Sequence, residues 1–377
     1  MSPPRNLRPP VPPPATPANA PLKGRGTTWA IAHRFERDER EVFDDGWGAL
    51  DAAAGELPSP LPTQVLEEHA GRILSENDSP DIGFEVSLNP YRGCEHGCIY
   101  CYARPSHAYL GWSPGLDFET RLVAKVNAAE RLRAALGARG YRPRPIAIGT
   151  VTDAYQPIER RLGITRAVLE VLHEARHPFS LITKSALVER DLDLIAPMAA
   201  AGRACVDITL TTLDAALARR LEPRAAAPER RLRTIRALSS AGVPVGVSVS
   251  PLIPFVNEPE LERVLEAAHQ AGAVRAFAIV LRLPSEVSPL FRHWLEQHFP
   301  DRAARVMARV QEMRGGRDNE PRFGSRMRGE GVWAELLRQR LRKACERLGL
   351  QHRHQRLDGS AFVPPSAPAA DAQQRLF

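Results

Sequence analysis

Short apolar runs alternate with longer amphipathic stretches through the middle of this 377-residue chain. Each run is rich in β-branched residues and is bounded by Gly, Pro or charged residues, which is the pattern of a buried strand. The stretches between them repeat apolar residues every three or four positions, as a helix does when it buries one face. The predicted strands are residues 84–88, 146–150, 179–183, 206–210, 245–249 and 277–281. The predicted helices are residues 119–136, 165–175, 187–199, 228–240 and 258–271.

Six strand-then-helix units in succession predict parallel strands that are joined by right-handed crossovers. No G-x-G-x-x-G follows the first strand, which argues against a dinucleotide-binding sheet. We therefore predict an α/β fold, a partial (β/α)6 barrel of the TIM type with N- and C-terminal extensions. Because reactive groups gather at the carboxyl ends of the strands in such barrels, the residues that follow each strand are the candidates for a site.

Composition divides the chain around this core. Residues 1–23 are rich in Pro and are predicted to form a disordered tail, because Pro fixes φ and removes amide donors. Residues 24–83 are predicted to be an extension packed on the core, because they include several aromatic residues: Trp29, Phe35, Phe43 and Trp47. The barrel is assigned to residues 84–300, a basic extension to residues 301–360 and a flexible tail to residues 361–377. Within the extension, residues 332–348 predict an amphipathic helix that packs on the barrel.

Three cysteines, Cys94, Cys98 and Cys101, follow the first predicted strand with C-x3-C-x2-C spacing. Thiolates are soft ligands that suit iron–sulfur clusters, zinc or Cu(I), and the short spacing lets one loop deliver all three to one inorganic core. A structural zinc site needs a fourth ligand, such as His96 or His107, and this alternative stays open. Disulfides are disfavoured because no signal segment is visible and the chain is expected to be cytoplasmic.

The stretch Cys94-Glu-His-Gly-Cys-Ile-Tyr-Cys-Tyr102, with an aromatic residue just before the last cysteine, resembles the signature of the radical S-adenosylmethionine (SAM) superfamily. Together with Thr183-Lys-Ser185, Leu221-Glu-Pro-Arg224 and Val247-Ser-Val-Ser-Pro251, it looks like the branch that includes spore photoproduct lyase, a DNA repair enzyme. The resemblance covers roughly residues 84–283. It implies that the three cysteines hold a [4Fe–4S] cluster whose open iron chelates the amino and carboxylate groups of SAM.

The resemblance further implies reductive cleavage of SAM to a 5′-deoxyadenosyl radical, which abstracts a hydrogen atom from substrate. An external electron donor such as flavodoxin or ferredoxin is then required. Tyr100 and Tyr102 are candidates either for aromatic walls around the cluster or adenine, or for phenols that relay a hydrogen atom. The alternatives are a non-enzymatic zinc or iron–sulfur binding module, and a radical SAM enzyme that modifies a protein or a small metabolite.

Polar residues after the later strands are candidates for holding SAM. Lys184 follows the third strand, where a lysine can meet the SAM carboxylate as a point charge. Asp153 and Glu159 follow the second strand, where the superfamily often places groups that receive the SAM ammonium. Thr211 and Ser250 follow the fourth and fifth strands and are further candidates, although small hydroxyls at such positions also cap helices.

Two further acidic and basic residues, Glu222 and Arg224, are expected to form a surface pair that contributes little to stability.

The formal net charge of +7 is concentrated near the C-terminus. Residues 301–356 contain 15 Lys and Arg but 7 acidic residues. Such an excess of positive charge is typical of a segment that binds a polyanion such as nucleic acid. Arg322, Arg326 and Arg328 are candidates for a phosphate clamp because the guanidinium fork makes paired hydrogen bonds. Alternatively, the extension serves only as a lid over the barrel. No apolar run approaches the length of a membrane span, so no membrane partner is expected.

Overall fold

The computed structural model describes residues 22–35, 62–352 and 356–365. The predicted Pro-rich tail up to residue 21, the aromatic residues Phe43 and Trp47, and the last twelve residues of the predicted flexible tail lie outside this part of the chain. Among the described residues, no helix is both long and apolar enough to cross a membrane.

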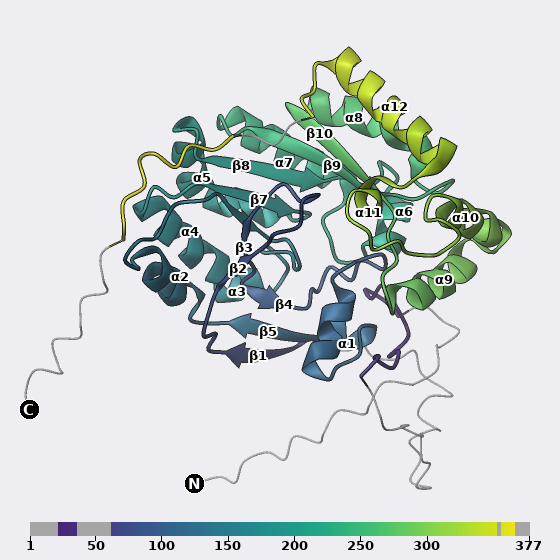
Figure 1. Ribbon diagram of the computed structural model, residues 1–377, viewed down its shortest axis with the longest axis horizontal. Coiled ribbons are helices and arrows are strands. Elements are labelled where there is room, and N and C mark those ends of the chain that lie inside the picture. Colours follow the sequence, from purple (N-terminus) through teal and green to yellow (C-terminus); the bar gives the residue numbers. More distant parts are fainter. Residues whose placement is uncertain (1–21, 36–61, 353–355, 366–377) are drawn as a thin grey trace, which may run out of the picture.

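A seven-stranded sheet forms the centre of the molecule, in the order β10-β9-β8-β7-β6-β3-β2 (Figure 1). Its first six strands in that order pair in parallel, and β2 (Leu74–Glu76) joins the edge antiparallel to β3. The parallel strands are β3 (Val86–Leu88), β6 (Ile146–Ile148), β7 (Phe179–Thr183), β8 (Ala204–Thr209), β9 (Val245–Leu252) and β10 (Arg275–Val280). The six predicted strands are therefore present, and the partial barrel is confirmed.

Helices cover the outer face of this sheet, as the periodicity predicts (Figure 1). In α4 (Ile164–Glu174), for example, Val168, Leu169 and Leu172 are fully buried in the main core. The other covering helices are α2 (Ala128–Leu136), α5 (Leu192–Ala200), α7 (Pro228–Ser240), α8 (Leu261–Gln270) and α12 (Gly331–Leu348). The last of these packs against α8 and β10, as the amphipathic pattern predicts.

The predicted helix at residues 119–136 is wrong in its first half. The chain there forms α1 (Leu116–Thr120), then β5 (Arg121–Lys125), and only then α2. In β5 the chain pairs in parallel with β1 (Gln64–Glu68) and antiparallel with β4 (Tyr91–Arg92), which makes a second, three-stranded sheet. The short apolar run in β5 fits either a strand or a helix, so pairing with distant segments decides its conformation.

The described helices also include several that the periodicity did not predict. The longer ones are α6 (Ala215–Leu221), α9 (Val287–His298) and α10 (Pro300–Glu312). The short ones are α3 (Glu159–Leu162), α11 (Ser325–Arg328) and the 3₁₀ turn η2 (Arg104–Leu110). The predicted helices at residues 187–199 and 258–271 each begin with a 3₁₀ turn, η3 (Ala186–Asp191) before α5 and η4 (Glu258–Glu260) before α8.

The described N-terminal segment, residues 22–35, lies against the loop that carries the three cysteines. The Gly26 amide donates to the Glu119 carboxylate over 2.8 Å, and a Cβ on Gly26 would lie only 1.8 Å from the Gly97 carbonyl oxygen. Farther along, the Trp29 carbonyl accepts from the Leu116 amide, and Arg34 pairs with Glu286 at 3.1 Å. Glycine at position 26 is required because the two backbones approach so closely.

A second segment, residues 313–331, lies over the carboxyl end of β10 and carries α11 (Figure 1). We call it the mouth loop. It is anchored by Arg314, which is 1% exposed and donates to the carbonyls of Val280 and Leu281 at 3.0 and 2.9 Å. The same guanidinium donates to the carbonyls of Ser325 and Arg326. One buried side chain thus joins the strand end to the mouth loop.

Candidate cluster and cofactor site

The three cysteines lie on one loop that follows β3 and β4. Cys94 and Cys98 are buried, Cys101 is partly exposed, and no disulfide joins them. Fully buried Arg104 holds the loop, because its guanidinium donates to the carbonyls of Cys98 at 3.0 Å and Gly97 at 3.2 Å. Arg104 also donates to the carbonyls of Pro114 and Gly115, and to the carboxylate of Glu119 at 2.5 Å.

The donor set fits a [4Fe–4S] cluster, to which each cysteine contributes one thiolate on a different iron. Burial raises the pKa of the Cys94 thiol and raises that of Cys98 to about 12, so the thiolates require a metal core or nearby cations. Such a cluster does not need side chains that converge on one ion. No group of three or more His, Cys, Asp or Glu residues converges in that way among the described residues.

The two histidines considered as a fourth zinc ligand are engaged elsewhere. His96 Nδ1 lies 3.2 Å from the Asp153 carboxylate, and His107 Nε2 lies 2.9 Å from the Arg121 carbonyl oxygen.

Asp153 connects the cysteine loop to the ends of two strands. One carboxylate oxygen accepts from the Thr183 hydroxyl at 2.7 Å and the Tyr155 amide at 2.9 Å. The other accepts from the Lys184 amide at 2.8 Å and faces His96. Burial alone would raise the pKa of Asp153, but His96 and these hydrogen bonds hold it below its ordinary value. Asp153 is therefore an ionised group whose accepting positions are filled by the protein.

Lys184 follows β7 and directs its charge toward the cysteine loop. Its ammonium lies 5.9 Å from the centre of the Tyr100 ring, and its charge acts on the Cys98 thiol and on Glu222. Burial alone would lower the pKa of Lys184, but these two acidic groups raise it above its ordinary value. Within the part of the chain that the structure describes, no hydrogen bond or ion pair involves this ammonium. A cation therefore remains available beside the thiolates.

Glu222 is the centre of a buried polar network beside Lys184. It accepts hydrogen bonds from the Tyr100 hydroxyl and from the Thr211 hydroxyl, the latter at 2.9 Å, and it pairs with Arg231. The side chains of Glu222 and Arg231 are 0% and 1% exposed. Burial alone would raise the pKa of Glu222, but Arg231 and Lys184 lower it below its ordinary value.

The expected surface pair between Glu222 and Arg224 is wrong. Arg224 pairs with Glu95 at 2.9 Å, whereas Glu222 turns inward to Arg231. Sequence reasoning missed Glu222 and Arg231 as residues of the site. Only the Leu221-Glu-Pro-Arg224 motif pointed to this position, and it did not indicate burial.

The structure does not bring all the predicted residues together. Tyr102 is half-exposed, and its hydroxyl donates to the Thr150 carbonyl. Ser250 accepts from the Ile279 amide at 3.1 Å, where the register between β9 and β10 shifts. The Ser250 hydroxyl therefore bonds an amide that the irregular pairing of β9 with β10 leaves without a backbone acceptor.

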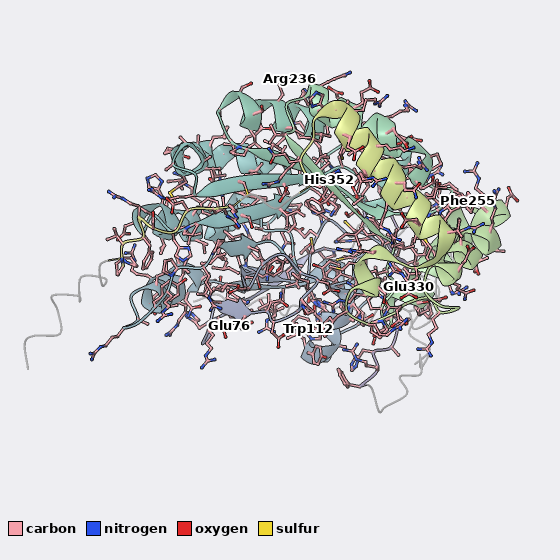
Figure 2. The ribbon with its side chains drawn as sticks, turned by 45° about the horizontal axis from the view of Figure 1, so that its top comes forward. Glu76, Trp112, Arg236, Phe255, Glu330 and His352 are labelled. Atoms are coloured by element: carbon pink, nitrogen blue, oxygen red, sulfur yellow. The ribbon has the colours of Figure 1, made fainter. Side chains whose placement is uncertain are left out.

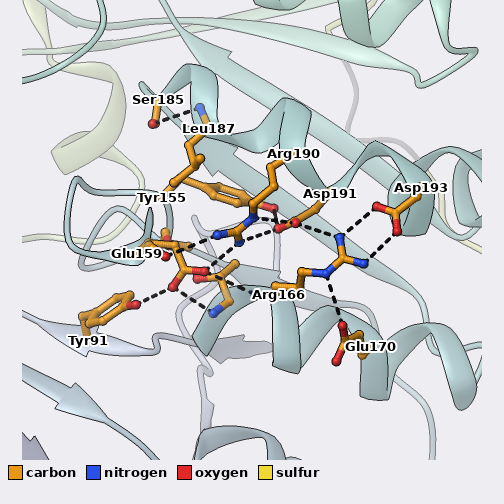
Figure 3. Close-up of polar contacts among 12 residues, drawn as sticks. Tyr91, Tyr155, Glu159, Arg166, Glu170, Ser185, Leu187, Arg190, Asp191 and Asp193 are labelled. Atoms are coloured by element: carbon orange, nitrogen blue, oxygen red, sulfur yellow. Dashed lines mark hydrogen bonds and ion pairs between the residues drawn. The ribbon is translucent and has the colours of Figure 1, made fainter. Parts of the chain in front are cut away.

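Glu159 belongs to a separate buried cluster (Figure 3). Its carboxylate accepts from the Tyr91 hydroxyl, from the Thr165 amide at 3.0 Å and from Arg190 at 2.8 Å. Arg190 also pairs with Asp191 at 2.7 Å. Glu159 is fully buried, so these bonds join β4, α4 and η3.

The three arginines of the predicted phosphate clamp differ in their pairing with carboxylates. Arg326 makes two hydrogen bonds to Asp81, at 2.8 and 2.6 Å, and Arg322 pairs with Glu320 at 3.1 Å. Arg328 is exposed. Two of the three guanidiniums are thus already paired with carboxylates.

Comparison with known proteins agrees with this geometry. A family model described as the radical SAM superfamily matches residues 88–268, which contain the cysteine loop, Lys184 and Glu222. This segment, slightly less than half of the chain, thus matches the radical SAM superfamily, which uses a [4Fe–4S] cluster and SAM.

Relatives in other organisms share this segment. An uncharacterized protein of Mycobacterium bovis is 36% identical over 226 residues, which cover 59% of this chain and 66% of that protein. An uncharacterized protein of Methanocaldococcus jannaschii is 27% identical over 241 residues, which cover 63% of this chain and 85% of that protein. The chain thus matches slightly less than two thirds of the mycobacterial relative.

Among solved structures, a spore photoproduct lyase mutant has a TM-score of 0.52 at 17% identity. The match covers 76% of this chain and 80% of that protein. Another structure of that lyase, with the same TM-score and 16% identity, is complexed with dinucleoside spore photoproduct. At this identity the likeness shows a shared fold.

We predict that Glu222→Gln lowers the free energy of unfolding by about 3 kcal/mol, because Arg231 would keep a buried charge without its counter-ion. Glu189→Gln is the matched control, since Glu189 pairs with Arg230 where both side chains are partly exposed, and it should cost less than about 1 kcal/mol. Urea unfolding followed by tryptophan fluorescence measures both. Equal losses in the two variants would contradict the structural role of the Glu222 network.

Proposed function

We propose that this protein is an enzyme that cleaves SAM reductively at a [4Fe–4S] cluster held by Cys94, Cys98 and Cys101, and that the resulting 5′-deoxyadenosyl radical abstracts a hydrogen atom from a nucleic acid or nucleotide. The observation that carries this proposal is the placement of three cysteines on one buried loop beside the Lys184 cation. The electron would come from an external donor such as flavodoxin or ferredoxin.

In this proposal Lys184 binds the SAM carboxylate, because no carboxylate of the described residues contacts its ammonium directly. Asp153 acts as a positioning residue instead of receiving the SAM ammonium, since protein donors fill its oxygens. Glu159 is left out of the SAM site for the same reason. Thr211 and Ser250 remain candidates for contacts with SAM, because Thr211 follows β8 and Ser250 lies in the last part of β9.

The two tyrosines have different proposed roles. The Tyr100 hydroxyl is buried and donates to ionised Glu222, so Tyr100 serves as a wall of the cluster pocket. Tyr102 is half-exposed beside Cys101, and we assign any relay of a hydrogen atom to its phenol.

The nucleic-acid assignment is supported by the basic C-terminal extension and by the lyase whose fold this chain shares. The mouth loop supports the alternative of a protein or small-metabolite substrate, because it is anchored over the end of β10 as a lid would be. Binding experiments with nucleic acids distinguish these substrate classes.

The cluster assignment is tested by anaerobic reconstitution. We expect about four irons per chain in the wild-type protein and none in Cys98→Ala. With dithionite and SAM, the wild-type protein should form 5′-deoxyadenosine and Cys98→Ala should form none. Cys205→Ala is the control, because Cys205 is buried in β8 away from the loop and should keep its iron. Stoichiometric zinc without sulfide in protein handled without oxygen would support the non-enzymatic alternative.

Replacement of Lys184 separates SAM binding from cluster binding. We expect Lys184→Ala to keep the iron content but to weaken SAM binding by about tenfold to a hundredfold, as the loss of one charge-assisted hydrogen bond does. Lys343→Ala, an exposed lysine on α12, should change neither quantity. Equilibrium binding of radiolabelled SAM to the reconstituted protein measures the effect. Unchanged SAM affinity, or loss of iron, would refute the role assigned to Lys184.

Nucleic-acid binding is tested by its dependence on salt. If the basic extension contacts phosphates, log affinity for duplex DNA should fall with log salt by about 0.9 per neutralised phosphate. Arg328→Gln should reduce that slope by about one unit, whereas Arg326→Gln should change it less, because Arg326 is paired with Asp81. Fluorescence anisotropy with single- and double-stranded DNA and RNA is the measurement. Absence of binding to all of them would leave the protein or metabolite substrate as the better account.

A further inference from the structure

We propose that Arg282 and the mouth loop form an anion subsite that binds a phosphate group of the substrate beside Tyr102. This inference deepens the proposed function and rests on it for the identity of the substrate.

Arg282 follows β10 and reaches toward α11, where it meets no carboxylate in the part of the chain that the structure describes. Its Nη1 contacts the Met327 sulfur at 3.2 Å, and its Nε is buried with no hydrogen-bond partner among the described residues. A thioether is a weak acceptor, so this contact orients the guanidinium and leaves its charge unbalanced. The groups that face Arg282 are Arg326, Tyr102 and Asp81. Burial and the charge of Arg326 lower the pKa of Arg282, although Tyr102 and Asp81 act to raise it.

The charges around the mouth loop do not balance. Arg282, Arg314 and Arg326 lie together, but only Arg326 is paired with a carboxylate, that of Asp81 at 2.6 Å. Within the described ranges Arg314 is bonded to backbone carbonyls alone, and burial and the charge of Arg282 lower its pKa to about 10. Glu320 also acts on Arg314, but its hydrogen bonds go to Arg322. Arg282 is partly buried and Arg314 is buried, and neither has a hydrogen-bonded counter-ion among the described residues. The two cations therefore repel each other, and a bound anion would relieve this repulsion.

Phosphate fits this position better than the carboxylate of SAM does. Lys184 already supplies a cation beside Cys98, whereas Arg282 faces Tyr102 and the mouth loop. The guanidinium also presents a planar fork of donors, which matches the oxygens of a phosphate. The mouth loop packs closely on the barrel, because a Cβ on Gly329 would lie 3.2 Å from the Val280 side chain. The loop would therefore hold the anion against a defined surface.

The test compares a charged probe with an uncharged one, using reconstituted, SAM-loaded protein under anaerobic conditions. The probes are the dinucleotide TpT, its methylphosphonate analogue without backbone charge, and inorganic pyrophosphate. Calorimetry should show that the wild-type protein binds TpT about tenfold or more tightly than the analogue, as the loss of one charge-assisted hydrogen bond predicts. Arg282→Gln should abolish that preference and the binding of pyrophosphate. SAM affinity should not change.

The control is Arg236→Gln, because Arg236 is exposed on the outside of α7, far from Glu330 of the mouth loop (Figure 2). It removes the same charge and should leave all three affinities unchanged. Binding of pyrophosphate that depends on Arg282, without binding of TpT, would support the anion subsite while refuting the nucleic-acid substrate. If Arg282→Gln weakens SAM binding instead, or if no probe depends on Arg282, the subsite is refuted.

Discussion

The buried ion pair between Arg104 and Glu119 is the interaction on which the site depends most directly. Neither side chain is exposed, and together they bind three parts of the chain. Arg104 donates hydrogen bonds to carbonyls of the cysteine loop and of the turn before α1. Glu119 accepts a hydrogen bond from the Gly26 amide of the N-terminal segment. Loss of either partner would leave a buried charge. Loss of Arg104 would also release the carbonyls of the cysteine loop, and loss of Glu119 would release the Gly26 amide. The positions of the thiols therefore depend on a pair that contacts no cofactor.

The site also divides its charged groups into two kinds. The carboxylates of Asp153, Glu159 and Glu222 are buried and accept hydrogen bonds from the protein, so they orient neighbouring groups. The cations Lys184 and Arg282 have no carboxylate bonded to them among the described residues. Because SAM carries a carboxylate and nucleotides carry phosphates, cations that the fold leaves unneutralised are suited to bind these ligands. The acidic groups determine where those cations lie.

Several features of the candidate site follow from local sequence. The spacing of Cys94, Cys98 and Cys101 placed them on one loop, and the position of Lys184 after an apolar run placed it at the end of a strand of the barrel. The partners of Asp153 and Glu222 could not be derived in this way. Tyr100 and Glu222 are 122 positions apart, and Arg326 and Asp81 are 245 apart, so nothing in their local pattern indicates that they meet.

The sequence by itself determined the six parallel strands, most of the helices that cover them and the loop that carries the cysteines. These features depend on periodicity and short spacing, which each segment carries within itself. Only the tertiary structure decided that residues 121–125 form a strand, that Glu222 pairs with Arg231, and that Arg326 is bonded to Asp81 while Arg282 is not. The physical reason is that strand pairing and ion pairing are contacts between distant segments. Their partners are selected when the chain packs, and many pairings are compatible with the same local sequence.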